Sequence, residues 1–169
     1  MKQSACRPKG FTLMELMIVV AIIGIITAIA VPNLLVAMQR AKQRRTMLDI
    51  KNIAQAWEAR NTEVSRYNAA GGSYDGAGEA TDMATVISFL SPTYMKTIPT
   101  VDSWNHPFVT YLDQPVGDVL AAQKYVILSG GKDGTIDSAG VPGPITNYDC
   151  DIVYSNGTFL SYPDGIVIR

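Results

Sequence analysis

Apolar positions are distributed unevenly along this chain. A short polar and basic stretch (1–10) is followed by an almost unbroken apolar run from Phe11 to Met38, in which Glu15 is the one charged residue. The core of that run, Phe11–Val31, would be about 31 Å long as a helix, and the hydrocarbon core of a bilayer is ~30 Å thick. The run therefore predicts a transmembrane helix.

Beyond this run the apolar positions follow a helical period, with charged residues on the opposite face. They recur at steps of three and four residues: Met47, Ile50, Ile53, Ala54 and Trp57. This spacing predicts an amphipathic helix with one buried face. We expect one helix from about Phe11 to about Val64, roughly 80 Å long, whose second half packs on a head.

The rest of the chain predicts a small α+β head. A Gly-rich loop (68–78) precedes a short helix that begins at Thr81 or Asp82 and ends at about Leu90, before Ser91-Pro92. Short strands separated by turn residues are expected at 108–112, 124–129, 152–154 and 158–161. The predicted fold is a long N-terminal helix packed on a small antiparallel β-sheet.

Charge divides the chain as well. Residues 1–67 carry ten Lys and Arg against four acidic residues, whereas residues 68–169 carry four Lys and Arg against eleven. The net charge of −1 argues against a general nucleic-acid binder, so no nucleic acid is expected as a partner. A basic, apolar front half therefore carries an acidic back half.

The apolar run differs from a cleaved secretory signal, and its one carboxylate needs an explanation. Signal peptides have an apolar stretch of about 7–15 residues and a small-residue cleavage site, whereas this run is longer and continues into amphipathic sequence. A charge inside the bilayer costs about 2.5–3.5 kcal/mol. Either Glu15 reaches the nearby interface, or a cation from a neighbouring subunit meets it.

The segment KGFTLMELMIVVAIIGIITAIAVPNLL (9–35) resembles the leader and helix start of type IV pilins and of type II secretion pseudopilins. Gly10 precedes Phe11, Glu15 stands at the glutamate of that motif, and Pro32 stands at its helix-interrupting proline. The resemblance implies three parts: a leader peptide (1–10), a transmembrane and filament-core helix (11–38), and a globular head (39–169) that includes the amphipathic half of the helix.

The resemblance also implies processing at the membrane. A prepilin peptidase would cut between Gly10 and Phe11, and the new Phe11 amine would be N-methylated. That amine is a natural partner for Glu15 of an adjacent subunit, because two costly charges would offset one another during assembly. Cys6 would leave with the leader, so Cys150 would have no partner for an intrachain disulfide.

Pro32 removes a helical hydrogen bond and clashes with the preceding turn. We expect a kink there in the isolated chain. The resemblance implies that the segment from Gly24 to Pro32 unwinds locally in the assembled filament.

Two further segments resemble the major pseudopilins of type II secretion: IPTVDSWNHPFVTY (98–111), in which Val101 is inserted and Asn105 replaces a common glycine, and YVILSGGKDGTIDS (125–138). The resemblance implies an inner-membrane protein with one N-terminal span and a periplasmic head. It would polymerise with itself into a periplasmic pseudopilus, with minor pseudopilins and an inner-membrane assembly platform, and drive folded proteins across the outer membrane. The alternative is a type IV pilin of an extracellular filament for adhesion, motility or DNA uptake.

In major pseudopilins the loop after the second segment binds Ca²⁺, a cation that takes oxygen ligands. The resemblance implies that Asp133, Asp149 and Asp151 are ligands here. Asp137 is a further candidate, although the Gly- and Pro-rich loop departs from the length usual in the family. The alternative is an acidic, solvated loop.

An enzyme is not expected. A single histidine, His106, excludes a multi-His zinc site and makes a Ser-His-Asp triad a poor hypothesis. A membrane-anchored hydrolase would depend on Asp149 and Asp151, for which no apolar pocket is evident that would raise a pKa. The loop GGSYDGAG (71–78) lacks the strand-to-helix context of a phosphate-binding loop, which argues against a ligand-binding anchor.

Three other residues receive structural interpretations. Trp104 is predicted to fill the core under a loop, and His106 is predicted to be a turn residue before Pro107. Cys150 is interpreted as a small, partly buried side chain.

Overall fold

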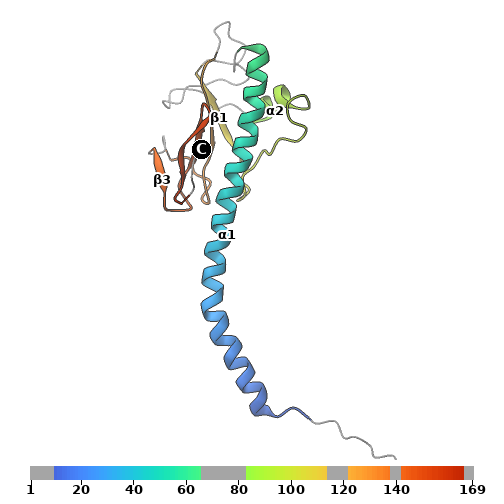
Figure 1. The fold of residues 1–169 in the computed structure, drawn as a ribbon, viewed down its shortest axis with the longest axis vertical. Coiled ribbons are helices and arrows are strands. Elements are labelled where there is room, and N and C mark those ends of the chain that lie inside the picture. Colours follow the sequence, from blue (N-terminus) through green and yellow to red (C-terminus); the bar gives the residue numbers. More distant parts are fainter. Residues whose placement is uncertain (1–9, 66–82, 114–121, 138–141, 166–169) are drawn as a thin grey trace, which may run out of the picture. The chain divides into compact units, whose positions relative to one another are not determined.

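The computed structural model describes residues 10–65, 83–113, 122–137 and 142–165. The chain divides into two compact units between Met38 and Gln39. Helix α1 (Leu13–Val64) is 52 residues long and contributes to both units (Figure 1). The expectation of one long helix ending near Val64 is confirmed.

The first unit contains the apolar part of α1. An 18-residue window has a mean hydropathy of 2.7 and none of it is buried, so α1 is long and apolar enough to cross a membrane. The helix continues through Pro32, whose missing N–H leaves the Ala28 carbonyl without its usual helical donor. One turn earlier, Thr27 Oγ1 donates to the Ile23 carbonyl at 2.7 Å.

In the second unit, the amphipathic part of α1 provides one side of the head's core. All five apolar positions expected on its inner face are buried: Met47, Ile50, Ile53, Ala54 and Trp57. Helix α2 (Met83–Leu90) is present as expected and contributes Met83, Val86 and Leu90 to the same core. The predicted cap of this helix, Thr81 or Asp82, lies outside the described residues.

The sheet has five strands in the order β1-β2-β4-β5-β3. They are β1 (Val109–Leu112), β2 (Tyr125–Ser129), β3 (Gly143–Ile145), β4 (Ile152–Ser155) and β5 (Thr158–Pro163). The four predicted strands are present and pair antiparallel. The fifth strand, β3, was not predicted and pairs parallel with β5, so the sheet is mixed. Its sequence Gly-Pro-Ile has no alternation of apolar and polar positions that would mark a strand.

A tight hairpin joins β4 to β5. Asn156 and Gly157 both have positive φ (43° and 88°), which is the backbone of a type I′ turn. The Asn156 side chain also accepts a hydrogen bond from the Tyr125 backbone N–H at 2.9 Å. The hairpin is therefore tied to β2 as well as to its own strands.

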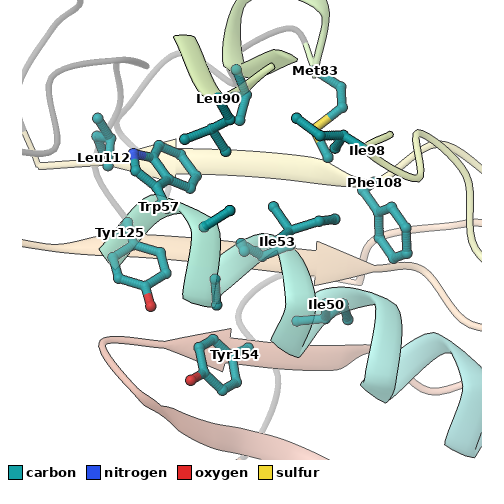
Figure 2. Close-up of a cluster of buried hydrophobic side chains, with 14 of the residues drawn as sticks. Ile50, Ile53, Trp57, Met83, Leu90, Ile98, Phe108, Leu112, Tyr125 and Tyr154 are labelled. Atoms are coloured by element: carbon teal, nitrogen blue, oxygen red, sulfur yellow. The ribbon is translucent and has the colours of Figure 1, made fainter. Parts of the chain in front are cut away.

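Alternation along β2 and β4 places side chains on both faces of the sheet. Tyr125 and Ile127 join the main core with Trp57, whose ring centroid lies 5.3 Å from that of Tyr125 (Figure 2). Val126, Leu128 and Val153 form a second buried cluster on the opposite face. All five residues of β2 are buried, as expected for an interior strand that pairs with β1 on one side and β4 on the other.

Candidate functional site

The first candidate site is the start of α1. Gly10, Phe11 and Thr12 precede the helix and are exposed. The bond proposed for cleavage, between Gly10 and Phe11, therefore lies in non-helical backbone. The Phe11 side chain is 76% exposed.

Glu15 is held by Thr12 of its own chain. Its Oε2 accepts hydrogen bonds from the Thr12 backbone N–H and from the Thr12 hydroxyl, both at 2.9 Å. The Glu15 backbone N–H in turn donates to the Thr12 hydroxyl oxygen at 3.2 Å. This reciprocal arrangement is a capping box, with Thr12 at the N-cap and Glu15 three residues later.

The capping box adds a role for Glu15 that the sequence reasoning missed. The spacing Thr-x-x-Glu before an apolar run is the sequence signature of a capping box, so the signal was present at Thr12 and Glu15. No cation within the described residues pairs with Glu15, but the subunit provides neutral hydrogen-bond donors. An amine from a neighbouring subunit would therefore add one contact to the hydrogen bonds that Glu15 already accepts from Thr12.

The second candidate site is the acidic loop after β2. Asp151 is 5% exposed, and neither of its carboxylate oxygens has a hydrogen-bond partner. Burial raises the pKa of Asp151 to about 6, and repulsion from Asp137 and Asp133 adds to the shift. The backbone N–H of Asp137 opposes this rise in pKa, although that N–H does not reach hydrogen-bond geometry with either Asp151 oxygen. A buried carboxylate without donors is costly unless a cation meets it.

The other three candidate ligands differ from Asp151 in their surroundings. Asp133 is exposed, and hydrogen bonds from Thr135 hold the pKa of its carboxyl below the usual value. Asp137 is also exposed. Asp149 lies 4.0 Å from the Lys132 ammonium.

The chemistry of this loop fits a calcium ion only in part. In the part of the chain that the structure describes, no three His, Cys, Asp or Glu side chains form a ready ligand group. However, Asp151 supplies a buried carboxylate without donors, and Asp133 and Asp137 are near enough to shift its pKa. Oxygen ligands around an uncompensated buried carboxylate are the donor set that Ca²⁺ prefers. The described residues therefore offer Ca²⁺ one buried carboxylate without donors, at Asp151, but no complete ligand set.

A network of hydrogen bonds fixes the start of this loop. Asp102 is buried, and its Oδ2 accepts from the Ser129 hydroxyl at 2.7 Å. The Ser129 oxygen accepts from the Gly131 N–H at 3.3 Å, and His106 Nδ1 lies 3.0 Å from the Gly131 carbonyl. A Cβ atom on Gly131 would come within 2.7 Å of the Cys150 carbonyl, so only glycine fits there.

The structure differs from the predictions for two single residues, Trp104 and Cys150, and agrees for a third, His106. Trp104 is not in the core: it is half-buried, and its Nε1 donates to Gln39 Oε1 at 2.9 Å. Trp57 is the fully buried tryptophan. His106 lies in a turn as expected, but its contact with Gly131 was not foreseen. Cys150 is exposed, not partly buried: it lies in a bend two residues before β4, and the buried residue at this point is its neighbour Asp151.

Comparison with known proteins defines the class. The sequence profile of the prokaryotic N-terminal methylation motif matches residues 6–31, a range that contains Gly10, Phe11 and Glu15. Together with the long helix and the small sheet, this match confirms the resemblance of the chain to type IV pilins and type II secretion pseudopilins.

Among these proteins, the similarity that covers most of the chain is to the type II secretion system core protein G. The protein of that name from Aeromonas hydrophila is 29% identical over 85% of this chain and 94% of its own length. The one from Escherichia coli is 27% identical over 84% of this chain and 92% of its own length. The type IV major pilin protein PilA of Myxococcus xanthus is 47% identical, but over 37% of this chain and 28% of its own length. No solved structure matches the chain.

Proposed function

We propose that this chain is the major pseudopilin of a type II secretion system, a structural subunit with no catalytic role. The observation that carries the proposal is the similarity to core protein G, which extends through the head and covers nearly the whole of those relatives. The match to a major pilin covers a much smaller share of that protein. The subunit would polymerise with itself and drive folded proteins across the outer membrane.

The start of α1 supports a specific order of assembly. A prepilin peptidase would cut the exposed Gly10–Phe11 bond and leave a cationic amine one residue before Thr12. Thr12 and Glu15 both remain in the mature chain, so the capping box survives cleavage. In the membrane it would keep the Glu15 carboxylate supplied with donors until the Phe11 amine of an adjacent subunit pairs with it.

The head would lie in the periplasm, because the resemblance implies this orientation for a single N-terminal span. The charge distribution does not decide it: Lys2, Arg7 and Lys9 precede the apolar run, and Arg40, Lys42, Arg44 and Arg45 follow it. Minor pseudopilins and an inner-membrane assembly platform are the further partners that the resemblance implies.

We propose in addition that the head binds Ca²⁺ through Asp151, with Asp133 and Asp137, whose charges raise the pKa of Asp151, as further ligands. Asp149 remains a candidate, but its contact with Lys132 supports it least. The ion would supply positive charge to a buried carboxylate that has no other partner. It would thereby join the loop after β2 to the start of β4.

The experiment that tests the main proposal is deletion of the gene, with the cellular location of the protein followed by an antibody to the head. A pseudopilin predicts loss of secreted enzymes from the culture medium, with the protein retained in the cell envelope. Long labelled fibres outside the cell at native expression, with secretion unchanged, would instead establish the type IV pilin alternative.

A further inference from the structure

A small polar cavity lies between α1 and the end of β5 in the head. Its volume is about 260 Å³, and it is lined by Arg40, Gln43, Arg44, Pro163, Asp164 and Gly165. None of the features described above uses it. Its lining combines two guanidinium groups with one carboxylate, so the cavity carries net positive charge and favours an anion.

The wall opposite α1 is fixed by backbone contacts. The Asp164 N–H donates to the Ile145 carbonyl at 2.9 Å. The Asp164 side chain accepts from the Gly165 N–H at 2.8 Å, and Gly165 has a φ of 79°. The Asp164 carboxylate is therefore engaged in its own turn. On the α1 side, Gln43 lines the cavity together with the two arginines and is only 4% exposed.

The two arginines are available to a ligand. Within the described residues, neither Arg40 nor Arg44 has a hydrogen bond or an ion pair, and both are exposed. The next residue, Arg45, differs because it pairs with Asp49 at 3.0 Å. Guanidinium groups bind phosphate oxygens through two parallel hydrogen bonds, which makes a phosphate the anion that fits best.

The position of Arg40 along the chain indicates where such a phosphate comes from. Arg40 follows Met38, the last residue of the apolar run, by two residues. From Phe11 to Arg40 a helix rises roughly 44 Å, and a bilayer with its headgroup regions is about 40–45 Å thick. With Phe11 at one membrane surface, Arg40 lies at the headgroup level of the other, and Arg44 reaches back along its flexible side chain.

We propose that this cavity binds the phosphate headgroup of an anionic phospholipid in the leaflet nearest the head. The ligand would be held by Arg40 and Arg44 against the 163–165 turn. The inference requires that α1 crosses a membrane, but it does not depend on whether the filament is a pseudopilus or a pilus. The head would then contact lipid directly, in addition to the contact that the apolar run of α1 makes with the bilayer.

An acidic surface of a second copy is the alternative partner, since residues 68–169 carry eleven acidic residues. Two observations favour the lipid. The arginines face a recessed cavity, which admits a phosphate more readily than a protein surface. They also follow the apolar run directly, so that headgroups reach them before any assembly occurs.

Native mass spectrometry of the full chain in detergent, with equal amounts of phosphatidylglycerol and phosphatidylcholine, tests the proposal. The wild type should retain phosphatidylglycerol preferentially.

Each basic residue near an anionic surface contributes about fivefold in affinity, so the double variant Arg40→Gln with Arg44→Gln should weaken retention of phosphatidylglycerol roughly thirtyfold. Asp164→Asn should strengthen it, because the amide keeps the turn and removes the opposing charge. A misfolded variant would not give this increase.

A matched control removes two charges elsewhere in the head: Lys51→Gln with Lys124→Gln, both exposed and outside the cavity. This variant should retain phosphatidylglycerol like the wild type. Equal loss in this control, or unchanged retention in the arginine variant, would overturn the proposal. Two further outcomes would overturn it. Inorganic phosphate could saturate the site in place of lipid, or the arginine variant could lose cross-linked dimers while it still retains lipid, which would identify a second copy of the chain as the partner.

Discussion

The Asp102 carboxylate accepts a hydrogen bond from the Ser129 hydroxyl at 2.7 Å, across 27 residues of sequence. This contact joins the segment before β1 to the end of β2, an interior strand of the sheet. The other Asp102 oxygen accepts from the backbone N–H groups of Trp104 and His106, both at 2.9 Å. One buried carboxylate thus organises a turn and the start of the acidic loop.

Asp102→Ala should therefore lower the free energy of unfolding by about 3 kcal/mol. It leaves the buried Ser129 hydroxyl and two partly buried backbone N–H groups without their acceptor. Asp102→Asn should cost about 1 kcal/mol, since its amide oxygen still accepts from the two backbone N–H groups. Denaturant unfolding of the full chain in detergent measures both. Equal losses for the two variants would show that the Ala variant fails through something other than its hydrogen bonds.

The long helix and the buried face of its second half were predictable because apolar periodicity is a local signal. Met47, Ile50 and Trp57 repeat at helical spacing, and no distant contact is needed to interpret them. Four of the strands were predictable for the same reason. Strand β3 was not, because its pairing with β5 arises from tertiary contacts and Gly143-Pro144-Ile145 contains no strand pattern.

The two tryptophans show where such reasoning ends. Trp57 was expected on the buried face of the amphipathic helix, and Trp104 was expected to fill the core under a loop. Trp57 lies on a periodic helix face, and its burial followed from that position. Trp104 lies in a turn, where no period fixes the direction of a side chain, and its indole N–H instead reaches Gln39.

The candidate metal site could be located from the sequence but not resolved into ligands. The acidic residues of the loop were evident as a group, whereas their different surroundings depend on burial and on Lys132. Asp151 directly precedes β4 and is carried inward with it, and Asp149, two residues earlier, remains near the lysine.

Asp151→Asn should abolish any rise in melting temperature that Ca²⁺ gives the full chain. Without Ca²⁺ it should not destabilise the head, because it replaces a buried carboxylate that lacks donors with a neutral side chain. Asp164→Asn, which removes an exposed carboxylate outside this loop, is the matched control and should keep the Ca²⁺ response. Thermal unfolding in millimolar Ca²⁺ and in EGTA measures both. A wild type that melts at the same temperature in the two solutions would end the calcium proposal.

The core of the head offers a test of its packing. The Tyr125 hydroxyl donates to Glu58 Oε1 at 2.6 Å, and its ring is fully buried beside Trp57. Tyr125→Phe keeps the ring and removes the hydroxyl, so it should lower the free energy of unfolding by roughly 1.5 kcal/mol. Trp57→Ala leaves a large cavity and should cost about 3–5 kcal/mol. Denaturant unfolding that ranks these variants in the reverse order would contradict this account of the core.

At the start of α1, three variants separate helix capping from ion pairing. Glu15→Ala removes both the acceptor for Thr12 and the charge, Glu15→Gln keeps an acceptor without the charge, and Thr12→Val keeps the charge without the capping hydroxyl. If the carboxylate pairs with the Phe11 amine of an adjacent subunit, both Glu15 variants should insert into the membrane and fail to polymerise. Thr12→Val should lose only about 1 kcal/mol of helix stability and still form filaments. Membrane fractionation and filament yield by electron microscopy provide the readouts. Wild-type filament yield from Glu15→Gln would show instead that the charge is dispensable, and loss of filaments from Thr12→Val would show that assembly depends on the cap.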